Sequence, residues 1–585
     1  MKDFLKYMLA SILGIIIVFA VIFFISFGIV MGLMSFAEEQ EVTIKENTLI
    51  RLDFKDPIPE RTPKSWVLTE IASGSNKKVL GLNDILKNIH YAAKDDNVKG
   101  IVMNLNIVPS GISTLEEIRN ALLEFRDSGK FILCYGEYMT QGAYYLASVA
   151  DQVYIHPQGF VDFKGLNAEV MFIKGLLDKL DIDMQVIRHG KFKSAVEPLM
   201  QKEMSPANRE QYTALINAIW DSMLGDIATS RNISKDELNR IASELLAYDA
   251  REAYANGLID GVKYRDEFRD EVSERMEVDF DDITVISLSQ YDRVMKKFPT
   301  TSDRIAVIYA TGEISGGQGN DEEVGSDRLA ETIEKVRKDE NVKAVVFRVN
   351  SPGGDALASD VIWRELDLLK AEKPLIVSMG DVAASGGYWI SCASDKILAD
   401  ETTLTGSIGV FGVVPNFGNF MENKLGITYD GTKTNENSGF PAITRSMTEY
   451  ERAVMQKKVE NVYDLFLERV AANRNMETEV VDSIGEGRVW SGTDARNLDL
   501  VDEFGGMYDA IAMAADIAGI GEYRLMELPV QVDPFEQLMN EIMGGVHSRM
   551  LKAEMGPLYN EYIQAKAALK WEGVQARLPF LLQLN

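Results

Sequence analysis

The chain has 585 residues, too many for one ordinary hydrophobic core, so two or more domains are expected. Its formal net charge of -28 argues against nucleic acid as a partner, because no basic stripe is present to neutralise phosphates. The four histidines and two cysteines form no metal-ligand pattern, so the sequence predicts no metal and no cofactor. Cys134 and Cys392 each lie in an apolar run and are predicted to be buried free thiols.

Residues 1–44 are predicted to form a transmembrane anchor and a short linker. Residues 7–37 carry no charge and would form about 45 Å of helix, enough to cross a bilayer core of about 30 Å. Lys2 and Lys6 favour a cytoplasmic N-terminus, so the rest of the chain is expected on the other side of the membrane. A cleaved signal peptide is the alternative, since residues 35–37 resemble a cleavage site, but its apolar region would span only about 7–15 residues.

After the anchor, apolar strands alternate with helices whose apolar residues recur at helical spacing. This order is typical of an α/β fold with a largely parallel sheet. In chain order the predicted elements are a strand at 49–54, a helix at 82–93, strands at 100–105 and 131–135, a long helix at 206–227, a strand at 305–310, a helix at 329–336, strands at 344–349 and 375–379, and a long helix at 448–472. The later elements follow the same order as the earlier ones.

The sequence itself contains the same duplication. Residues 94–102 recur as residues 338–346, at an offset of 244. At this offset residues 136–144 also match residues 380–388. An ordered series of matches at a nearly constant offset indicates two homologous units rather than a chance similarity.

We therefore predict four segments along the chain. The anchor and linker at 1–44 are followed by a first α/β repeat at 45–298 and a second at 299–526. Residues 527–585 are expected to form a C-terminal extension with one or two helices. The apolar residues of this extension favour packing on the body or on another subunit.

A serine in the second repeat is the candidate nucleophile. Ser385 lies among small residues at a predicted strand-to-helix turn. Such a turn exposes a nucleophile and places it at a helix N-terminus, where free N–H groups favour developing negative charge. The first repeat has Gln141 at the equivalent position. A purely structural tight turn is the alternative, because Ala383 replaces the first glycine of the usual G-x-S-x-G pattern.

Two glycines are candidate donors to an oxyanion. Gly354 belongs to a Gly-Gly pair directly after a predicted buried strand, and Gly386 follows the candidate nucleophile. One backbone N–H that contacts the oxyanion stabilises the transition state by about 3–4 kcal/mol. The alternative is an ordinary turn, since Pro-Gly-Gly is common in turns.

A lysine is the candidate general base, because no histidine lies in a suitable context. Burial that lowers its pKa from about 10.4 to about 8 costs roughly 3 kcal/mol, which a large domain tolerates. Lys191 and Lys193 occur together in the first repeat, and the second repeat has Asn437 in place of Lys193. The first repeat thus keeps a lysine without the serine, and the second keeps the serine without a lysine. This complementary loss predicts one active site between the repeats.

Four motifs, at residues 193–198, 351–354, 384–388 and 405–410, together resemble the long, duplicated form of signal peptide peptidase A. This is a bacterial Ser-Lys protease family of the ClpP/crotonase superfamily, and the resemblance covers nearly the whole chain.

The resemblance implies a role for each residue of the site. Ser385 would attack the substrate and Lys193 would accept its proton. Ser407 would orient the lysine, and Gly354 and Gly386 would form the oxyanion hole. Lys191 is a second candidate, because in an extended segment residues two apart share a face.

The resemblance also implies how the protein is assembled and where it acts. It implies two tandem ClpP/crotonase-like repeats, a bowl-shaped homotetramer and a single-pass location in a bacterial inner membrane, with the catalytic repeats on the periplasmic side. The substrates would be signal peptides left in the membrane after signal peptidase has acted. Two alternatives are an acyl-CoA-processing protein, since crotonases share the superfamily fold, and a catalytically inactive membrane scaffold.

Overall fold

The structure is a computed structural model that describes residues 44–64, 79–294, 301–531 and 574–578, with a few positions before residue 44. Nearly all of the predicted anchor, and most of the predicted C-terminal extension, lie outside these residues. Among the helices of the described part, none combines the length and the apolar character needed to cross a bilayer.

The first repeat is built on a six-stranded parallel sheet in the order β8-β5-β3-β2-β1-β9. Its strands are β1 (Thr48–Leu52), β2 (Val98–Asn104), β3 (Phe131–Gly136), β5 (Gln152–Ile155), β8 (Gly261–Val262) and β9 (Thr284–Ser287). Helices α3 (Leu82–Lys94) and α4 (Ile112–Asp127) pack against each other and bury their apolar faces in the core of this sheet. Strands buried on both faces read as apolar runs in the sequence, which is why they could be predicted.

The second repeat is built on an eight-stranded sheet, in which β19-β17-β15-β13-β10-β21 form the main path. Its strands are β10 (Arg304–Thr311), β13 (Val342–Ser351), β15 (Leu375–Ala384), β16 (Lys396–Ala399), β17 (Leu404–Gly406), β19 (Val489–Ser491), β20 (Glu503–Phe504) and β21 (Arg524–Leu528). All neighbours pair in parallel except β17 and β19. The predicted α/β class is therefore confirmed, and the order helix, strand, helix, strand recurs as α13 (Ser326–Lys338), β13, α14 (Ala356–Lys370) and β15.

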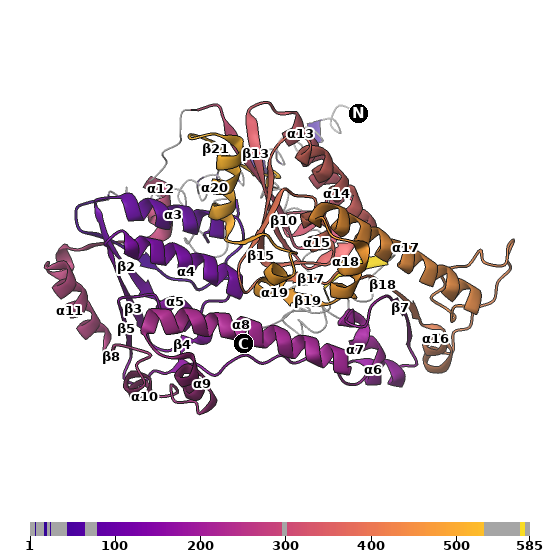
Figure 1. Ribbon diagram of the computed structural model, residues 1–585, viewed down its shortest axis with the longest axis horizontal. Helices are drawn as coiled ribbons and strands as arrows, with labels where there is room; N and C mark the ends of the chain where they lie inside the picture. Colours follow the sequence, from indigo (N-terminus) through magenta and orange to yellow (C-terminus); the bar gives the residue numbers. More distant parts are fainter. Residues whose placement is uncertain are drawn as a thin grey trace.

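The two repeats lie side by side and share a hydrophobic core (Figure 1). Helix α20 (Met507–Ala518), near the end of the second repeat, packs its buried face into the core that also holds α3 and α4. Helix α8 (Pro206–Arg231) runs along both repeats, and its middle is buried in the same core. The counterpart of α8 in the second repeat is α17 (Glu449–Arg474).

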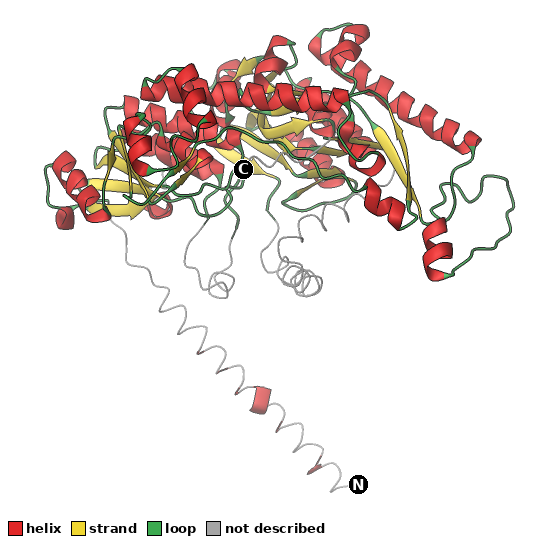
Figure 2. Cartoon of the chain, turned by 90° about the horizontal axis from the view of Figure 1, so that it is seen from below, coloured by secondary structure: helices red, strands yellow, loops and turns green. Residues whose placement is uncertain are grey.

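A third, mixed sheet joins segments from three parts of the chain, in the order β12-β11-β14-β22-β18-β7. Its strands are β7 (Asp183–Arg188), β11 (Glu313–Ser315), β12 (Glu323–Gly325), β14 (Gly353–Asp355), β18 (Phe411–Asn416) and β22 (Val574–Arg577). The long β7–β18 pair reaches toward one end of the molecule, close to α16 (Gly418–Leu425) (Figure 2). Residues 574–577 form a strand, β22, where the sequence analysis expected a helical extension. They are extended because they pair with β14 on one side and with β18 on the other.

Candidate active site

The structure brings the predicted serine and lysine together between the two repeats. Lys193 Nζ lies 2.7 Å from Ser385 Oγ, although 192 positions separate the residues in the chain. Both side chains are completely buried. The lysine follows β7 of the first repeat at the start of a 3-10 turn (Ser194–Val196), and the serine follows β15 of the second. The pair therefore exists only where the repeats meet.

Ser385 lies at a strained turn. It separates β15 from the short helix α15 (Gly386–Ser391) and has φ 57° and ψ -115°. A positive φ is uncommon outside glycine, and such strain is concentrated at functional sites. Its backbone N–H donates to the carbonyl of Gly406 at 2.8 Å, which fixes the turn against β17. The predicted strand-to-helix turn is thus present, and it directs the hydroxyl toward the lysine.

Lys193 lies in an environment that favours its neutral form. Its Nζ is 3.0 Å from Ser407 Oγ and 3.1 Å from the carbonyl oxygen of Ser407. Burial lowers the pKa of Lys193 well below its usual value, because the charged form loses its hydration. The backbone of Gly487 covers the stem of the lysine, and a Cβ atom added to Gly487 would lie only 2.6 Å from Lys193 Cβ.

Ser407 is held in place by the segment that also covers the lysine. Its backbone N–H donates to the carbonyl of Arg488 at 2.7 Å, and its hydroxyl donates to the carbonyl of Gly487 at 3.3 Å. Ser407 has φ 51°, directly after β17. Its hydroxyl oxygen remains directed at Lys193 Nζ.

The two candidate oxyanion donors lie next to each other. A Cβ atom added to Gly386 would lie 3.1 Å from the backbone nitrogen of Gly354. Neither position has room for a side chain, because a Cβ at Gly354 would lie 2.0 Å from the carbonyl oxygen of Ile314 and one at Gly386 would lie 2.7 Å from Ser359 Oγ. The packing of the chain around them therefore requires glycine at both positions.

The structure separates the second lysine candidate from the site. Lys191 points outward with 64% of its side chain exposed, and it pairs with Glu486 at 3.1 Å. Asn437, the equivalent of Lys193 by sequence offset, lies in an exposed loop. Cys134 and Cys392 are buried and free, as predicted. In the part of the chain that the structure describes, no group of histidine, cysteine and acidic side chains could hold a metal ion.

Two supporting residues were not identified from the sequence. Glu197 is completely buried and accepts hydrogen bonds from Ser205 Oγ at 2.6 Å and Asn208 Nδ2 at 2.9 Å. Gln211 on α8 accepts from the backbone N–H of Val489 at 2.7 Å. These contacts fix the lysine-bearing segment to α8, and α8 to β19. A charged residue within the otherwise apolar stretch at 195–199 was the available signal for Glu197.

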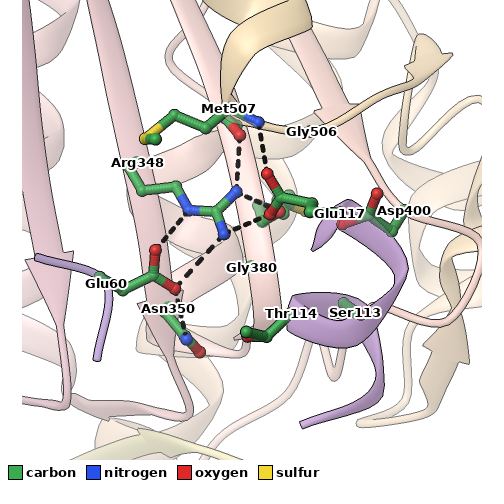
Figure 3. Close-up of polar contacts among 12 residues, drawn as sticks. Glu60, Ser113, Thr114, Glu117, Arg348, Asn350, Gly380, Asp400, Gly506 and Met507 are labelled. Atoms are coloured by element: carbon green, nitrogen blue, oxygen red, sulfur yellow. Dashed lines mark hydrogen bonds and ion pairs between the residues drawn. The ribbon is translucent and has the colours of Figure 1, made fainter. Parts of the chain in front are cut away.

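A buried ionic cluster connects the two repeats (Figure 3). Arg348 on β13 contacts Glu60 Oε2 at 2.8 Å and Glu117 Oε1 at 2.6 Å, and all three side chains are almost fully buried. The carboxylates belong to the first repeat. Asn350 donates to Glu60 at 2.6 Å, and the backbone N–H of Met507 donates to Glu117 at 2.8 Å.

A second set of interface contacts lies on β15 itself, four residues before the serine. Asp381 accepts hydrogen bonds from the backbone N–H of Thr114 at 3.0 Å and from its hydroxyl at 2.7 Å. Nearby, Thr402 donates its hydroxyl to Glu116 at 2.6 Å. Burial raises the pKa of Asp381, and it raises the pKa of Glu116 to about 7. The first repeat therefore fixes the strand that carries Ser385.

Comparison with known proteins assigns the chain to one family. The sequence pattern of peptidase family S49 matches the chain twice, at residues 124–279 and at residues 367–521. "Protease 4" of Salmonella typhi is 36% identical over 514 residues, which cover 86% of this chain and 82% of the relative. "Serine protease SPPA, chloroplastic" of Arabidopsis thaliana is 32% identical over 512 residues, which cover 85% and 74%. A mutant of ClpP1 from Listeria monocytogenes superposes with a TM-score of 0.24 and 15% identity, covering 35% of this chain and 94% of that one.

Proposed function

The chain belongs to peptidase family S49 and is a serine-type peptidase, and we propose that it degrades signal peptides after signal peptidase has released them, using a Ser-Lys dyad. The observation that carries the proposal is the 2.7 Å contact between Ser385 Oγ and Lys193 Nζ inside a fully buried site.

The proposed reaction is acyl transfer. Ser385 Oγ attacks the scissile carbonyl while the neutral amine of Lys193 takes its proton. The resulting ammonium donates that proton to the leaving amine. A water molecule then hydrolyses the acyl-enzyme, again with Lys193 as the base. Ser407 keeps the amine in line with the serine, as its 3.0 Å contact supports.

Gly354 and Gly386 are the proposed oxyanion donors. Gly386 directly follows the nucleophile, a Cβ atom added to it would lie 3.1 Å from the backbone nitrogen of Gly354, and neither glycine has a side chain that would shield its N–H from a carbonyl oxygen. Donors that are already in place stabilise developing charge without reorganisation during the reaction.

The substrate class and the location are part of the proposal. The apolar residues 7–37 support an inner-membrane anchor, with the catalytic repeats on the periplasmic side. An enzyme anchored there meets signal peptides where they accumulate. A homotetramer of ClpP/crotonase-like repeats is proposed from the family resemblance.

The proposal is tested by two measurements on the full-length protein. A fluorophosphonate probe followed by peptide mapping is expected to label Ser385. Mass spectrometry is expected to show cleavage of a synthetic signal peptide in lipid vesicles. Absence of both label and cleavage would favour the inactive scaffold, and acyl-CoA turnover without labelling would favour the crotonase alternative.

The pH dependence should report the ionisation of Lys193. Because burial lowers its pKa, the amine loses its proton at a lower pH than the usual 10.5. Below the lowered pKa the ammonium cannot accept the serine proton, so kcat/KM should rise with pH through a midpoint below 10.5. A peptide without titratable side chains isolates this ionisation. A flat profile, or a midpoint at the ordinary lysine value, would contradict the assignment.

Ser407→Ala should lower kcat/KM about 10-fold, because a hydrogen bond of this kind contributes about 1–1.5 kcal/mol. Without the Oγ acceptor the ammonium form is less stable, so the midpoint of the pH profile should also move to lower pH. Ser394→Ala is a matched control, since this buried hydroxyl donates to a carbonyl away from the dyad. A rate loss without any shift of the profile would indicate a merely structural role for Ser407.

A further inference from the structure

Helix α4 of the first repeat is capped by a residue of the second repeat. Its N-cap residue is Gly111, which has no side chain to accept the N–H groups of the first turn. Asp381 on β15 takes this role, because its carboxylate accepts the backbone N–H and the hydroxyl of Thr114. A Cβ atom added to Gly111 would lie 2.1 Å from Asp381, so the two segments are in contact. Helix α4 is thus attached to the strand that precedes Ser385.

The same helix carries part of a cluster of acidic residues between the repeats. This acidic cluster consists of Glu60, Glu116, Glu117, Asp381 and Asp400. Asp400, the first residue after β16, lies beside Glu117 in Figure 3 and is only 2% exposed. The charged side chains that face it are Glu117, Glu116, Arg348 and Asp381. Arg348 is the one cation among these four, and it is already paired with Glu60 and Glu117.

Helix α19 (Gly492–Asn497) also contacts Asp400, but through a glycine. A Cβ atom added to Gly492 would lie 1.9 Å from the carbonyl oxygen of Asp400. The charged side chains of this helix, Asp494 and Arg496, contact a serine and a phenylalanine instead. The charge of the acidic cluster is therefore balanced from β13 and not from α19.

The surroundings of Asp400 favour its protonated form. Among the described residues, no donor reaches its buried Oδ2 atom. A carboxylate oxygen that loses its hydration and gains no donor is strongly unfavourable, whereas a protonated carboxyl is tolerated. Burial, followed by the charges of Glu117 and Glu116, raises the pKa of Asp400 well above its ordinary value. In the described part of the chain these carboxyls are not arranged to hold a metal ion, so a proton is the counter-charge at hand.

Glu116 adds a second ionisation to the acidic cluster. Burial, with smaller contributions from Asp226 on α8 and from Glu401, raises the pKa of Glu116 to about 7 against the hydrogen bond from Thr402. Above this pH Glu116 is charged and faces Asp400. Two interacting carboxyls lose their protons in separate steps, because the first charge opposes the second. The proton on Asp400 is therefore the one that keeps the closed interface from accumulating charge.

The turn that begins at Asp400 leads directly to the residues of the proposed site. Thr403 in this turn donates its hydroxyl to a backbone carbonyl of β15 at 2.9 Å. Beyond the turn, β17 pairs with the last residues of β15, and Ser407 and Ser385 follow the two strands. Lys193 belongs to the other repeat. A change in how α4 packs on this turn is thus transmitted to both serines and alters their position relative to the lysine.

We propose that a proton on Asp400 holds the two repeats closed around the dyad, and that its release to water at alkaline pH opens the interface and separates Ser385 from Lys193. An ionised Asp400 repels Glu116 and Glu117 on α4, and the new carboxylate is stabilised only when water reaches it. Opening between α4 and the turn after β16 meets both requirements. The effect on activity rests on the Ser-Lys peptidase function proposed above, whereas the opening itself does not.

The direction of the pH effect follows from the proton balance. Asp400 keeps a proton in the closed state at pH values where an exposed carboxyl has lost it, so the stabilisation is complete below the ordinary pKa of 3.8 and is lost as pH rises through the raised pKa. Lys193 acts in the opposite sense, because activity appears as its pKa is passed and the amine loses its proton. Activity should therefore pass through a maximum and fall on the alkaline side.

Hydrogen exchange at increasing pH tests the opening in the full-length protein. Exchange times are scaled for the intrinsic pH dependence of amide exchange, and peptides from α14 serve as the internal reference. Peptides from α4 and from residues 400–406 are expected to lose protection between about pH 6 and about pH 9, because both lie at the opening interface. Unchanged protection of both segments over this range in the wild-type protein would overturn the proposal, whatever the variants do.

Two matched variants identify the responsible group. Asp400→Asn replaces the titrating carboxyl with a neutral group of the same shape, and it should keep both segments protected over the whole range. Glu124→Gln removes an exposed carboxyl from the same helix, α4, and should lose protection like the wild type. A loss of protection in Asp400→Asn equal to that of the wild type would exclude Asp400 as the group that holds the interface closed.

Peptide cleavage in the same pH series tests the effect on the site. With a substrate that has no titratable side chains, kcat/KM of the wild type is expected to rise and then fall. Asp400→Asn should keep the rising limb, and its falling limb should move by about one pH unit or more toward alkaline pH. Returning a wild-type sample from high pH to neutral pH should restore the rate, because the proton binds reversibly.

The exchange and cleavage results separate the two proposals. Protein that shows the expected exchange but cleaves no peptide at any pH would overturn the Ser-Lys peptidase function and leave the opening of the interface standing. Wild-type protein that cleaves the peptide with no fall in kcat/KM on the alkaline side would overturn the control of the dyad by Asp400 and leave the peptidase function standing.

Discussion

Lys193→Met should reduce kcat/KM for peptide cleavage by about 1000-fold or more, because the substitution removes the proposed base and keeps an unbranched side chain of similar length. Without a neutral amine 2.7 Å from its oxygen, Ser385 has no group to accept its proton. The fold should survive, since methionine needs no hydration at this fully buried position. Steady-state kinetics with a fluorogenic peptide and a thermal melt provide the measurement.

Lys191→Met is the matched control for this prediction. Lys191 is two residues away, exposed, and paired with Glu486 on the surface. Its replacement should leave kcat/KM within about twofold of wild type, since exposed ion pairs contribute about 0–1 kcal/mol. Equal losses in both variants, or substantial activity in Lys193→Met, would show that Lys193 is not the base.

Arg348→Met should lower the free energy of unfolding by about 3–5 kcal/mol, because it leaves Glu60 and Glu117 buried without their cation. Burial already raises the pKa of Glu117, so its protonated form is the one that the interior tolerates. The loss should therefore be smaller at acidic pH and should grow as pH rises and the carboxyl ionises. Chemical denaturation of wild type and variant at several pH values measures both effects.

Two further variants test whether the cluster itself is responsible. Arg364→Met removes an exposed arginine that contacts Asp367 at 2.7 Å, and it should change stability by less than about 1 kcal/mol. Adding Glu60→Gln and Glu117→Gln to Arg348→Met should restore much of the loss, because no unpaired charge then remains buried. A destabilisation of Arg348→Met no larger than that of Arg364→Met would show that the interface does not depend on the cluster.

The fold class could be predicted because its strands are buried on both faces. The predicted strand at 131–135 corresponds to β3 and that at 344–349 lies within β13, with differences only at the ends. Strand ends depend on pairing with distant segments, which apolar patterning does not reveal. The C-terminal strand β22 was missed for the same reason: its four residues pair with β14 and β18, more than 150 positions away.

The site was predictable where the duplicated copies differ. The first copy has Gln141 in place of Ser385, and the second copy has Asn437 in place of Lys193. These differences indicated one candidate residue in each copy. Spacing alone could not separate Lys193 from Lys191, since the choice depends on which side chain the turn before α7 (Glu197–Met200) buries. Arg348 was not singled out, because its partners Glu60 and Glu117 lie more than 200 positions away and cannot be read from the sequence.

The division of the dyad between two repeats of one chain has a consequence for how the site forms. The lysine and serine segments are covalently connected, so their meeting is a unimolecular step whose extent does not depend on protein concentration. Dilution of the enzyme would not separate the two groups, as it would if they belonged to different molecules. Each chain also carries one lysine and one serine half-site, so their ratio is fixed at synthesis. Because of the covalent linkage, one repeat can lack the lysine and the other the serine while every chain still carries both.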